Sequence, residues 1–422
     1  MKIWYLLCVA LLLLNACTAE EKSIAVTGVK LNQETAALTV GKIMVLTANI
    51  FPYNATNKGV SWKSSQPEVV SVTGQGIITA NSPGTATITV TTIDGEKTAK
   101  CDVSVSLPAV VSNEIIVAYV VSWKNSIPDP ALLTHINYAF GHVSSSFDKV
   151  DVSNPSRLSS IVALKSRKPE LKILISIGGW GSGGFSEMAR DDTKRLSFAA
   201  DCKRLLDQYH LDGIDLDWEY PTQTAGGLIQ ASPQDTENFT LLLHDIRKAI
   251  GNGKLLTFAS VSSAKFVDFE AVNPYIDFVN IMTYDIARPP WHHSGLYRSQ
   301  FTRGLSCDES VKEHVNAGIP LNKLTMGIPF YGHGTGGIDS DIEYSKISGL
   351  TGFSEMWDNV AKAPYLVNSS GAFVCTFDNP RSIAEKCKYI KEKGMLGAMY
   401  WEYDQDDANG TLRKAVYNGL KN

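Results

Sequence analysis

Four acidic residues fall within eight positions of the segment from Leu211 to Pro221, which reads LDGIDLDWEYP. Three of them, Asp215, Asp217 and Glu219, alternate with large apolar residues. Because side chains two positions apart on a strand project from the same face, a strand here directs three carboxylates to one side. Gathering like charges raises the pKa of at least one carboxyl group, and proton transfer in catalysis uses such a group.

A solvated strand face and a calcium-binding loop are the structural alternatives for this segment. The alternate positions, Ile214, Leu216 and Trp218, are too apolar for a loop, and the glycine spacing of an EF-hand is missing. A proton-transfer site is therefore favoured. Asp212 has a different parity from the other three acids, so we expect it to support the end of the strand.

The segment DGIDLDWEYP resembles the signature of glycoside hydrolase family 18, the chitinase-type hydrolases, whose pattern is DxxDxDxE. Two further segments are similar to elements of that family. Residues 176–179 read SIGG and resemble the SxGG element, although a tight turn alone explains such a sequence equally well. Residues 282–285 read MTYD and resemble the MxYD element.

From Glu114 onward, continuous apolar runs alternate with charged segments of helical period. The strands we expect are Ile115–Val121, His135–Phe140, Leu171–Ile177, Gly213–Glu219, Leu255–Val261, Asp277–Thr283, Leu324–Phe330 and Gly397–Trp401. The helices we expect include Asp192–Tyr209, Asp235–Ile250 and Ser382–Lys393. Apolar strands joined by helices indicate parallel pairing, and eight of them predict an α/β fold, the (β/α)8 TIM barrel.

The family resemblance implies hydrolysis with retention, in which the N-acetyl oxygen of the substrate attacks the anomeric carbon to give an oxazolinium intermediate. In that scheme Glu219 is the general acid and Asp217 orients the acetamido N–H. Asp215 is expected to hydrogen-bond Asp217 and to share its proton, and Tyr284 to brace the acetamido carbonyl. The scheme requires no cofactor and no metal, and we expect the pair His292-His293 to lack the further ligands that a metal site needs.

Barrel enzymes place substrate-binding residues at the carboxyl ends of their strands. The resemblance implies that Trp401 lies beneath the reacting sugar and that Asp285 contacts it. Other candidates for substrate binding are Met282, Tyr119, Phe140, Trp180, Gly178, Gly179 and Tyr331, with Ser176 as structural support. Core packing explains Met282, Tyr119 and Phe140 at least as well, and Trp180 could simply cover the barrel rim.

Long members of the family insert an α+β subdomain between the seventh and eighth strands. The segment from Gly332 to about Trp357 is too short for such an insertion, so we expect none. The resemblance then implies an open groove in place of a deep, tunnel-like site.

The N-terminal residues have the pattern of an export signal, with Lys2 followed by an apolar run, Ile3–Leu14, that is too short to span a bilayer. The following residues complete the sequence LNAC, which resembles a bacterial lipobox and implies a lipoprotein signal peptide over residues 1–16, with lipidation of Cys17. Residues 17–23 would form a tether. We expect an exported protein anchored by lipid to the bacterial outer membrane or cell surface; a plain secretory signal is the alternative.

Residues 24–106 form a separate zone rich in Thr, Val, Ser and Gly. Short alternating runs separated by turn sequences predict a small antiparallel all-β sandwich. The stretches WKSSQPEVV and SPGTATI resemble the bacterial immunoglobulin-like group 2 module, for which a spacer role is favoured over adhesion. Residues 107–113 are expected to be a linker, and 114–422 the barrel domain.

Composition narrows the function further. A formal net charge of −4 argues against a dedicated nucleic-acid binder. Seven cysteines occur without CxxC pairs, so no zinc site is suggested, and those after the leader are expected to be buried free thiols. We expect a monomeric chitinase acting on chitin or chitooligosaccharides. The alternatives are an endo-β-N-acetylglucosaminidase acting on the chitobiose core of N-glycans and a non-catalytic chitin-binding lectin.

Overall fold

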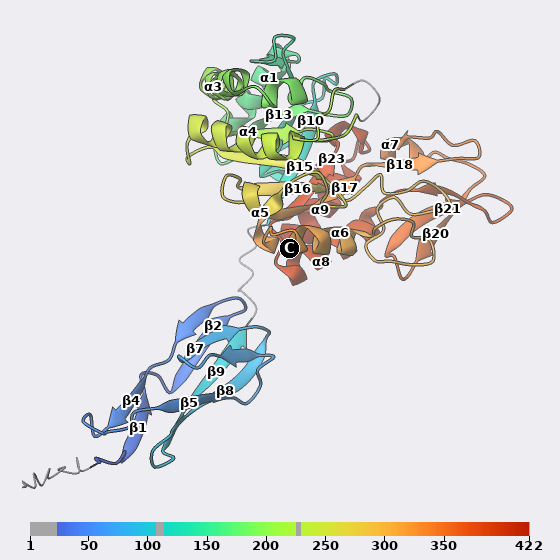
Figure 1. Ribbon diagram of the computed structural model, residues 1–422. Helices are drawn as coiled ribbons and strands as arrows, with labels where there is room; N and C mark the ends of the chain where they lie inside the picture. The colour runs from blue at the N-terminus through green and yellow to red at the C-terminus, as the bar shows by residue number, and fades with distance from the viewer. Residues whose placement is uncertain (1–22, 107–113, 225–228, 422) are drawn as a thin grey trace, which may run out of the picture. The chain divides into compact units, whose positions relative to one another are not determined.

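The computed structural model describes residues 23–106, 114–224 and 229–421 (Figure 1). The chain forms two compact units, Met1–Val110 and Val111–Asn422, which we describe separately. The predicted signal peptide, Cys17 and the predicted linker lie outside the described residues. In the part of the chain that is described, no helix is both long and apolar enough to cross a membrane.

The N-terminal unit consists of short strands arranged in three sheets. Its strands are β1 (Gly28–Leu31), β2 (Thr35–Thr39), β3 (Ile43–Val45), β4 (Ala48–Phe51), β5 (Val60–Ser64), β6 (Val70–Val72), β7 (Ile77–Ala80), β8 (Gly84–Thr92) and β9 (Thr98–Ser106). The sheets have the orders β1-β4, β2-β9-β8-β5 and β3-β7-β6. All pairs are antiparallel except β2–β9, whose parallel direction joins segments far apart in the sequence and could not be predicted from alternation alone.

The core of this unit is formed by apolar residues that alternate with polar ones along its strands. Along β8 every second side chain is buried, including Ile88 and Val90. Ile88 belongs to the same apolar cluster as Val70 and Ile78, which come from the three-stranded sheet. The predicted all-β sandwich is therefore confirmed, because the two larger sheets share one core.

The second unit is a closed barrel of eight parallel strands (Figure 1). They are β10 (Ile115–Val121), β11 (His135–Val143), β13 (Lys172–Gly178), β14 (Gly213–Asp217), β15 (Leu255–Val261), β16 (Phe278–Met282), β17 (Leu324–Pro329) and β23 (Gly397–Trp401). Each pairs with the next in parallel, and β10 closes the barrel by pairing with both β11 and β23. A short strand, β12 (Val150–Val152), pairs antiparallel with β11. The predicted TIM barrel is confirmed.

Helices connect the barrel strands. They are α1 (Pro155–Val162), α2 (Phe185–Ala189), α3 (Asp192–Tyr209), α4 (Asp235–Ile250), α5 (Phe269–Val272), α6 (Cys307–Asn316), α8 (Pro380–Lys393) and α9 (Thr411–Lys421). Helix α3 begins after Asp191, whose carboxylate accepts hydrogen bonds from two backbone N–H groups of the first turn. Helix α8 begins two residues before the predicted Ser382, because Asn379 caps it and a proline occupies the first turn.

Strand β14 separates its polar and apolar side chains as predicted. Ile214 and Leu216 belong to the large apolar core that includes residues of α3 and α4. Trp218 stacks on Phe185 and meets the edge of Phe239 from α4. The opposite parity, which carries Asp215 and Asp217, therefore faces the barrel interior.

An α+β insertion does follow the seventh barrel strand, and the prediction that none exists is wrong. It comprises β18 (Tyr331–Gly334), β19 (Ile342–Glu343), α7 (Tyr344–Ile347), β20 (Ser354–Asp358), β21 (Ala363–Val367) and β22 (Phe373–Thr376). Its five strands form one sheet in the order β19-β18-β22-β21-β20. The insertion continues to Thr376, well beyond Trp357, and its strands are too short to give a clear periodic signal.

Candidate active site

A cavity of about 270 Å³ opens where the barrel strands end. Its lining residues are Tyr119, Trp123, Phe140, Trp180, Asp217, Glu219, Ala259, Met282, Tyr284, Asp285, Tyr331 and Trp401. The structure thus brings together the predicted catalytic and substrate-binding residues, with the exceptions of Asp215, Gly178 and Gly179. Trp123 and Ala259 were not predicted.

Asp215 lies beneath the cavity and is wholly buried. Its carboxylate accepts four hydrogen bonds, from Tyr119 Oη (2.8 Å), Ser176 Oγ (2.8 Å), Thr257 Oγ1 (2.5 Å) and Asn280 Nδ2 (3.2 Å). Burial raises the pKa of Asp215, and the four donors oppose that rise. Four donors hold the carboxylate in one orientation, so Asp215 fixes neighbouring strands at the floor of the site. Ser176 has the structural role predicted for it.

The predicted hydrogen bond between Asp215 and Asp217 is not formed. Both oxygens of Asp215 are occupied by the donors just described, and Asp217 Oδ1 is buried without any hydrogen-bond partner. Burial, followed by the charges of Glu219 and Asp215, raises the pKa of Asp217 well above its ordinary value. Asp217, which lines the cavity, therefore has one carboxyl oxygen whose hydrogen-bonding capacity is unused.

Glu219 lies two residues beyond the end of β14, at the cavity wall. Burial raises its pKa to about 7; a hydrogen bond from Tyr220 opposes the rise and the charge of Asp285 adds to it. A carboxyl group with a pKa near 7 is half protonated at neutral pH and can donate a proton to a leaving group. Tyr220 is a further residue that the sequence reasoning did not identify.

Tyr284 presents a phenol to the same cavity. Its hydroxyl makes one weak contact, with Met399 Sδ at 3.8 Å. Burial, followed by the charges of Asp217 and Asp285, raises the pKa of Tyr284 well above its ordinary value, so the hydroxyl keeps its proton. An O–H group with so weak a partner is available to donate to a carbonyl oxygen in the cavity.

Aromatic rings form the apolar surfaces of the cavity. Trp401 stacks against Phe140 with ring centroids 5.6 Å apart and packs at a tilt against Tyr119. Two tryptophans at the cavity lining are mostly exposed, Trp123 by 61% and Trp180 by 66%. Large exposed aromatic faces beside a cavity suit the C–H faces of sugar rings. Trp123 lies two residues beyond the end of β10 at Val121, and this position after a barrel strand was the signal that could have identified it.

Gly178 and Gly179 support the site without lining it. Both have positive φ, and a Cβ on Gly178 would lie 2.1 Å from the Asp217 carbonyl oxygen. A Cβ on Gly179 would lie 2.7 Å from the ring of Phe140. The prediction that they bind substrate is therefore replaced by a backbone role: only glycine allows strands β13 and β14 to approach here.

Asp212 lies just before β14, at the opposite end of the strand from the cavity. Its carboxylate accepts a hydrogen bond from the Ile173 backbone N–H at 2.8 Å and forms an ion pair with Lys165 at 2.5 Å. These contacts join two strands and a neighbouring helical turn. The supporting role predicted for Asp212 agrees with this position.

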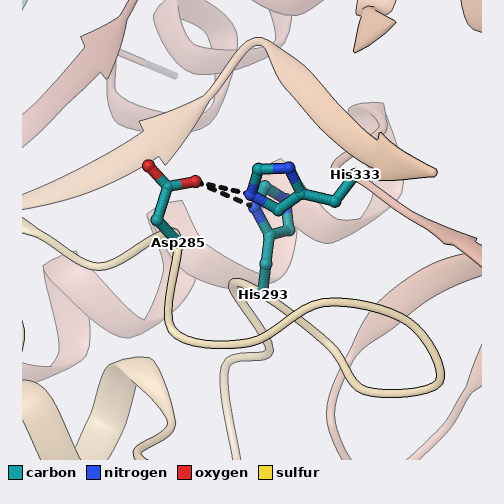
Figure 2. Close-up of side chains that lie close together, drawn as sticks. All are labelled: Asp285, His293 and His333. Carbon is teal, nitrogen blue, oxygen red and sulfur yellow. Dashed lines mark hydrogen bonds and ion pairs between the residues drawn. The ribbon is translucent and has the colours of Figure 1, made fainter. Parts of the chain in front are cut away.

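Asp285 lies on a different wall, in a group with two histidines (Figure 2). Its Oδ1 accepts hydrogen bonds from Tyr331 Oη (2.7 Å) and His333 Nε2 (2.6 Å), and His293 Nδ1 lies 3.9 Å away. Partial burial raises the pKa of Asp285, but the two histidines and Tyr331 outweigh it and hold the pKa well below its usual range. Asp285 is therefore ionised at all ordinary pH values.

The statement that His293 has no further ligand-type neighbours is wrong. The barrel loop carries Asp285 and His293, and the unexpected insertion supplies His333. No spacing in the sequence could have shown this, because His333 approaches only through the fold of β18. His292 instead faces Asp358 at 3.3 Å.

The five described cysteines are buried and free, as predicted. None lies at the cavity. The pKa of each thiol is raised, and burial is the largest cause in every case. None of the five is therefore a reactive thiolate.

A closed (β/α)8 barrel with coupled carboxyl groups at the carboxyl ends of its strands defines a class of barrel proteins equipped for acid–base chemistry. Comparison with known families narrows this class. The model of the family "Glycosyl hydrolases family 18" matches residues 115–406, and that of the "Bacterial Ig-like domain (group 2)" matches residues 25–103. The chain belongs to glycosyl hydrolase family 18 and carries a bacterial Ig-like domain before its barrel.

Three relatives illustrate the similarity. Chitinase A1 of Niallia circulans is 33% identical over 326 residues, which cover 65% of this chain and 45% of that protein. Probable chitinase 2 of Drosophila melanogaster is 29% identical over 363 residues, 71% of this chain and 74% of that protein. A solved family 18 N-acetylglucosaminidase from Paenibacillus barengoltzii aligns with a TM-score of 0.67 and 34% identity over 73% of this chain and 100% of that chain. The chain thus spans less than half the length of Chitinase A1.

Proposed function

We propose that this protein is a chitinase that hydrolyses β-1,4-linked N-acetylglucosamine polymers or oligomers with retention of configuration. One observation carries the proposal: the cavity is lined by a protonatable Glu219, by Asp217 with one unpartnered carboxyl oxygen, and by Tyr284, whose hydroxyl makes only a weak contact. The similarity to chitinases of family 18 supports the same conclusion.

Glu219 acts as the general acid. With a pKa raised to about 7 by burial, it holds a proton at neutral pH and can transfer it to the glycosidic oxygen as the bond to the leaving sugar breaks. The carboxylate that results then accepts a proton from the incoming water. The same group serves both half-reactions, as a retaining mechanism requires.

Asp217 and Tyr284 act on the acetamido group of the reacting sugar. The unpartnered carboxyl oxygen of Asp217 accepts the acetamido N–H and stabilises the positive charge that develops as the acetamido oxygen attacks the anomeric carbon. The Tyr284 hydroxyl donates to that oxygen and orients it. Substrates must therefore carry a 2-acetamido group, which directs the enzyme to chitin-type chains.

Product analysis by mass spectrometry tests this function. The purified protein is incubated with chitohexaose and, in parallel, with a high-mannose glycoprotein; Glu219→Gln is the control. Short N-acetylglucosamine oligomers from the hexamer, absent with the variant, would support the proposal. Cleavage confined to the glycan core would indicate an endo-β-N-acetylglucosaminidase, and binding of oligomer without cleavage by the wild type would indicate a lectin.

We also propose, from the sequence, that Cys17 carries a lipid that anchors the protein to the bacterial outer membrane or cell surface. The support is the LNAC sequence after a short apolar run, and the Ig-like domain then acts as a spacer. Cys17→Ser should move the protein from the membrane fraction to the soluble fraction. Equal membrane retention of the variant would contradict lipid anchoring, and binding of chitin by residues 24–106 alone would indicate adhesion.

A further inference from the structure

A carboxylate at the cavity, that of Asp285, lies close to two imidazoles, those of His293 and His333 (Figure 2). Asp285 follows β16, His293 belongs to the loop after it, and His333 lies on β18 of the insertion. One possible ligand atom from each residue lies within 4.8 Å of the others. Of these three residues, Asp285 alone lines the cavity and alone was expected to contact the sugar, so the two histidines require a separate explanation.

His333 has oxygen acceptors at both ring nitrogens. Its Nδ1 lies 2.9 Å from Asp341 Oδ1 and 3.1 Å from the Ser340 carbonyl oxygen, while its Nε2 lies 2.6 Å from Asp285 Oδ1. A neutral imidazole has only one N–H. Both sides of the ring are satisfied only if Nδ1 carries a proton and a second proton or a metal ion lies between Nε2 and the Asp285 carboxylate.

His293 is wholly buried, and neither ring nitrogen has a hydrogen-bond partner. Its Nδ1 is directed at the same carboxylate, 3.9 Å from Asp285 Oδ1. Buried polar side chains nearly always have a partner, so two unpartnered nitrogens on one imidazole are unusual.

We propose that Asp285, His293 and His333 bind a zinc ion. Two imidazoles and one carboxylate are a donor set that suits Zn²⁺ and leaves a fourth position open. The Ser340 carbonyl oxygen and the Asp341 carboxylate lie 3.1 and 2.9 Å from His333 Nδ1, which is the kind of outer contact that usually orients a metal-ligating histidine. The Asp285 side chain is 56% exposed and lines the cavity, so the three residues border the substrate cavity.

Zinc at this site inhibits the enzyme. Asp285 lines the substrate cavity, and an ion that engages its carboxylate removes that group from contact with the sugar. Zinc and chitooligosaccharide therefore compete. This consequence rests on the proposed function, whereas zinc binding itself does not.

Metal titration tests the site directly. The purified, chelator-treated protein is titrated with zinc chloride by calorimetry, and with cobalt chloride by visible absorption. We expect one zinc per chain and the visible bands of a four- or five-coordinate cobalt ion, abolished by added zinc. Zinc inhibition of chitohexaose cleavage should weaken as substrate concentration rises.

The variants separate this site from adventitious binding. Asp341 has a 59% exposed side chain, so Asp341→Asn should fold normally and weaken zinc binding by about 10- to 100-fold. His293→Gln and His333→Gln should abolish the stoichiometric site. His244→Gln is the matched control, because His244 lies on α4 with a 47% exposed side chain and should bind zinc as the wild type does.

Two results would overturn zinc binding at this site, and two others would refute a separate claim. Absence of zinc binding at micromolar metal, or octahedral cobalt bands alone, would exclude the site. Unchanged zinc affinity in Asp341→Asn together with both histidine variants would place the ion elsewhere. Stoichiometric zinc binding without inhibition would refute only the inhibitory role, and zinc binding to a protein that cleaves no substrate would refute only the proposed function.

Discussion

The cavity has two acidic walls whose carboxyl groups behave in opposite ways. On the β14 wall, burial raises the pKa of Asp217 and of Glu219, the latter to about 7. On the wall after β16, two histidines and Tyr331 hold the pKa of Asp285 well below its usual range. The same functional group is thus a proton donor on one side and a permanent anion on the other.

The difference comes from the neighbours of each carboxyl group. Asp217 Oδ1 has no donor, so burial and the charges of nearby acids determine its pKa. Asp285 accepts hydrogen bonds from Tyr331 and His333, and the imidazole of His293 lies nearby. Hydrogen bonds to the charged form outweigh desolvation only where donors are provided. A fold can therefore assign acid and anion roles to identical side chains within one cavity.

The largest effect should follow loss of the acid on the β14 wall. Glu219→Gln keeps the size of the side chain but cannot transfer a proton, so kcat on chitohexaose should fall by about 10²- to 10⁴-fold. Steady-state hydrolysis measures this. Glu237→Gln, on the exposed face of α4, is the matched control and should retain full activity; a similar loss in both variants would point to a folding defect.

Loss of the anion on the other wall should have a smaller effect. Asp285→Asn removes a charged acceptor that lines the cavity while Glu219 keeps its proton. A hydrogen bond to a charged group contributes about 1.5–3 kcal/mol, so kcat/KM should fall by about 10- to 100-fold. A loss as large as that of Glu219→Gln would mean that the two walls do not have separate roles.

The sequence predicted the barrel because its strands are buried on both faces and therefore appear as continuous apolar runs. Three strands, Ile115–Val121, Leu255–Val261 and Gly397–Trp401, have the predicted bounds. The alternation around Asp215 and Asp217 also placed these side chains correctly inside the barrel. These features depend on local pattern alone.

What could not be predicted depends on contacts between distant segments. Thr257 and Asn280 donate to Asp215 only because of the register of β14, β15 and β16. Those donors prevent the hydrogen bond that had been expected between Asp215 and Asp217. His333 reaches Asp285 through an insertion whose strands are two to five residues long, too short for a periodic signal.

The pH dependence of catalysis tests whether Glu219 and Asp285, which lie on the two walls of the cavity, interact electrostatically. The acid must be protonated, so kcat/KM should decline above about pH 7 as Glu219 ionises. The negative charge of Asp285 raises the pKa of Glu219. Removing that charge in Asp285→Asn should therefore shift the alkaline limb of the pH profile to lower pH. An unshifted limb would show that the walls are electrostatically independent.

The smallest effect should be on stability, and its sign follows from the direction of the Glu219 shift. The ordinary carboxyl pKa of 4.5 applies to the unfolded chain, and the folded protein holds this proton until about pH 7. The folded state therefore loses stability relative to the unfolded chain as pH rises through that window, by about 3 kcal/mol when the loss is complete.

Glu219→Gln cannot ionise, so it should be more stable than the wild type above pH 7 and should lose that advantage near pH 4. Denaturant unfolding of both proteins at pH 4 and pH 8 measures the difference between them. An equal difference at the two pH values would show that Glu219 is not held protonated by its burial. The protonation of Glu219 that the proposed reaction requires would then have to arise from substrate binding.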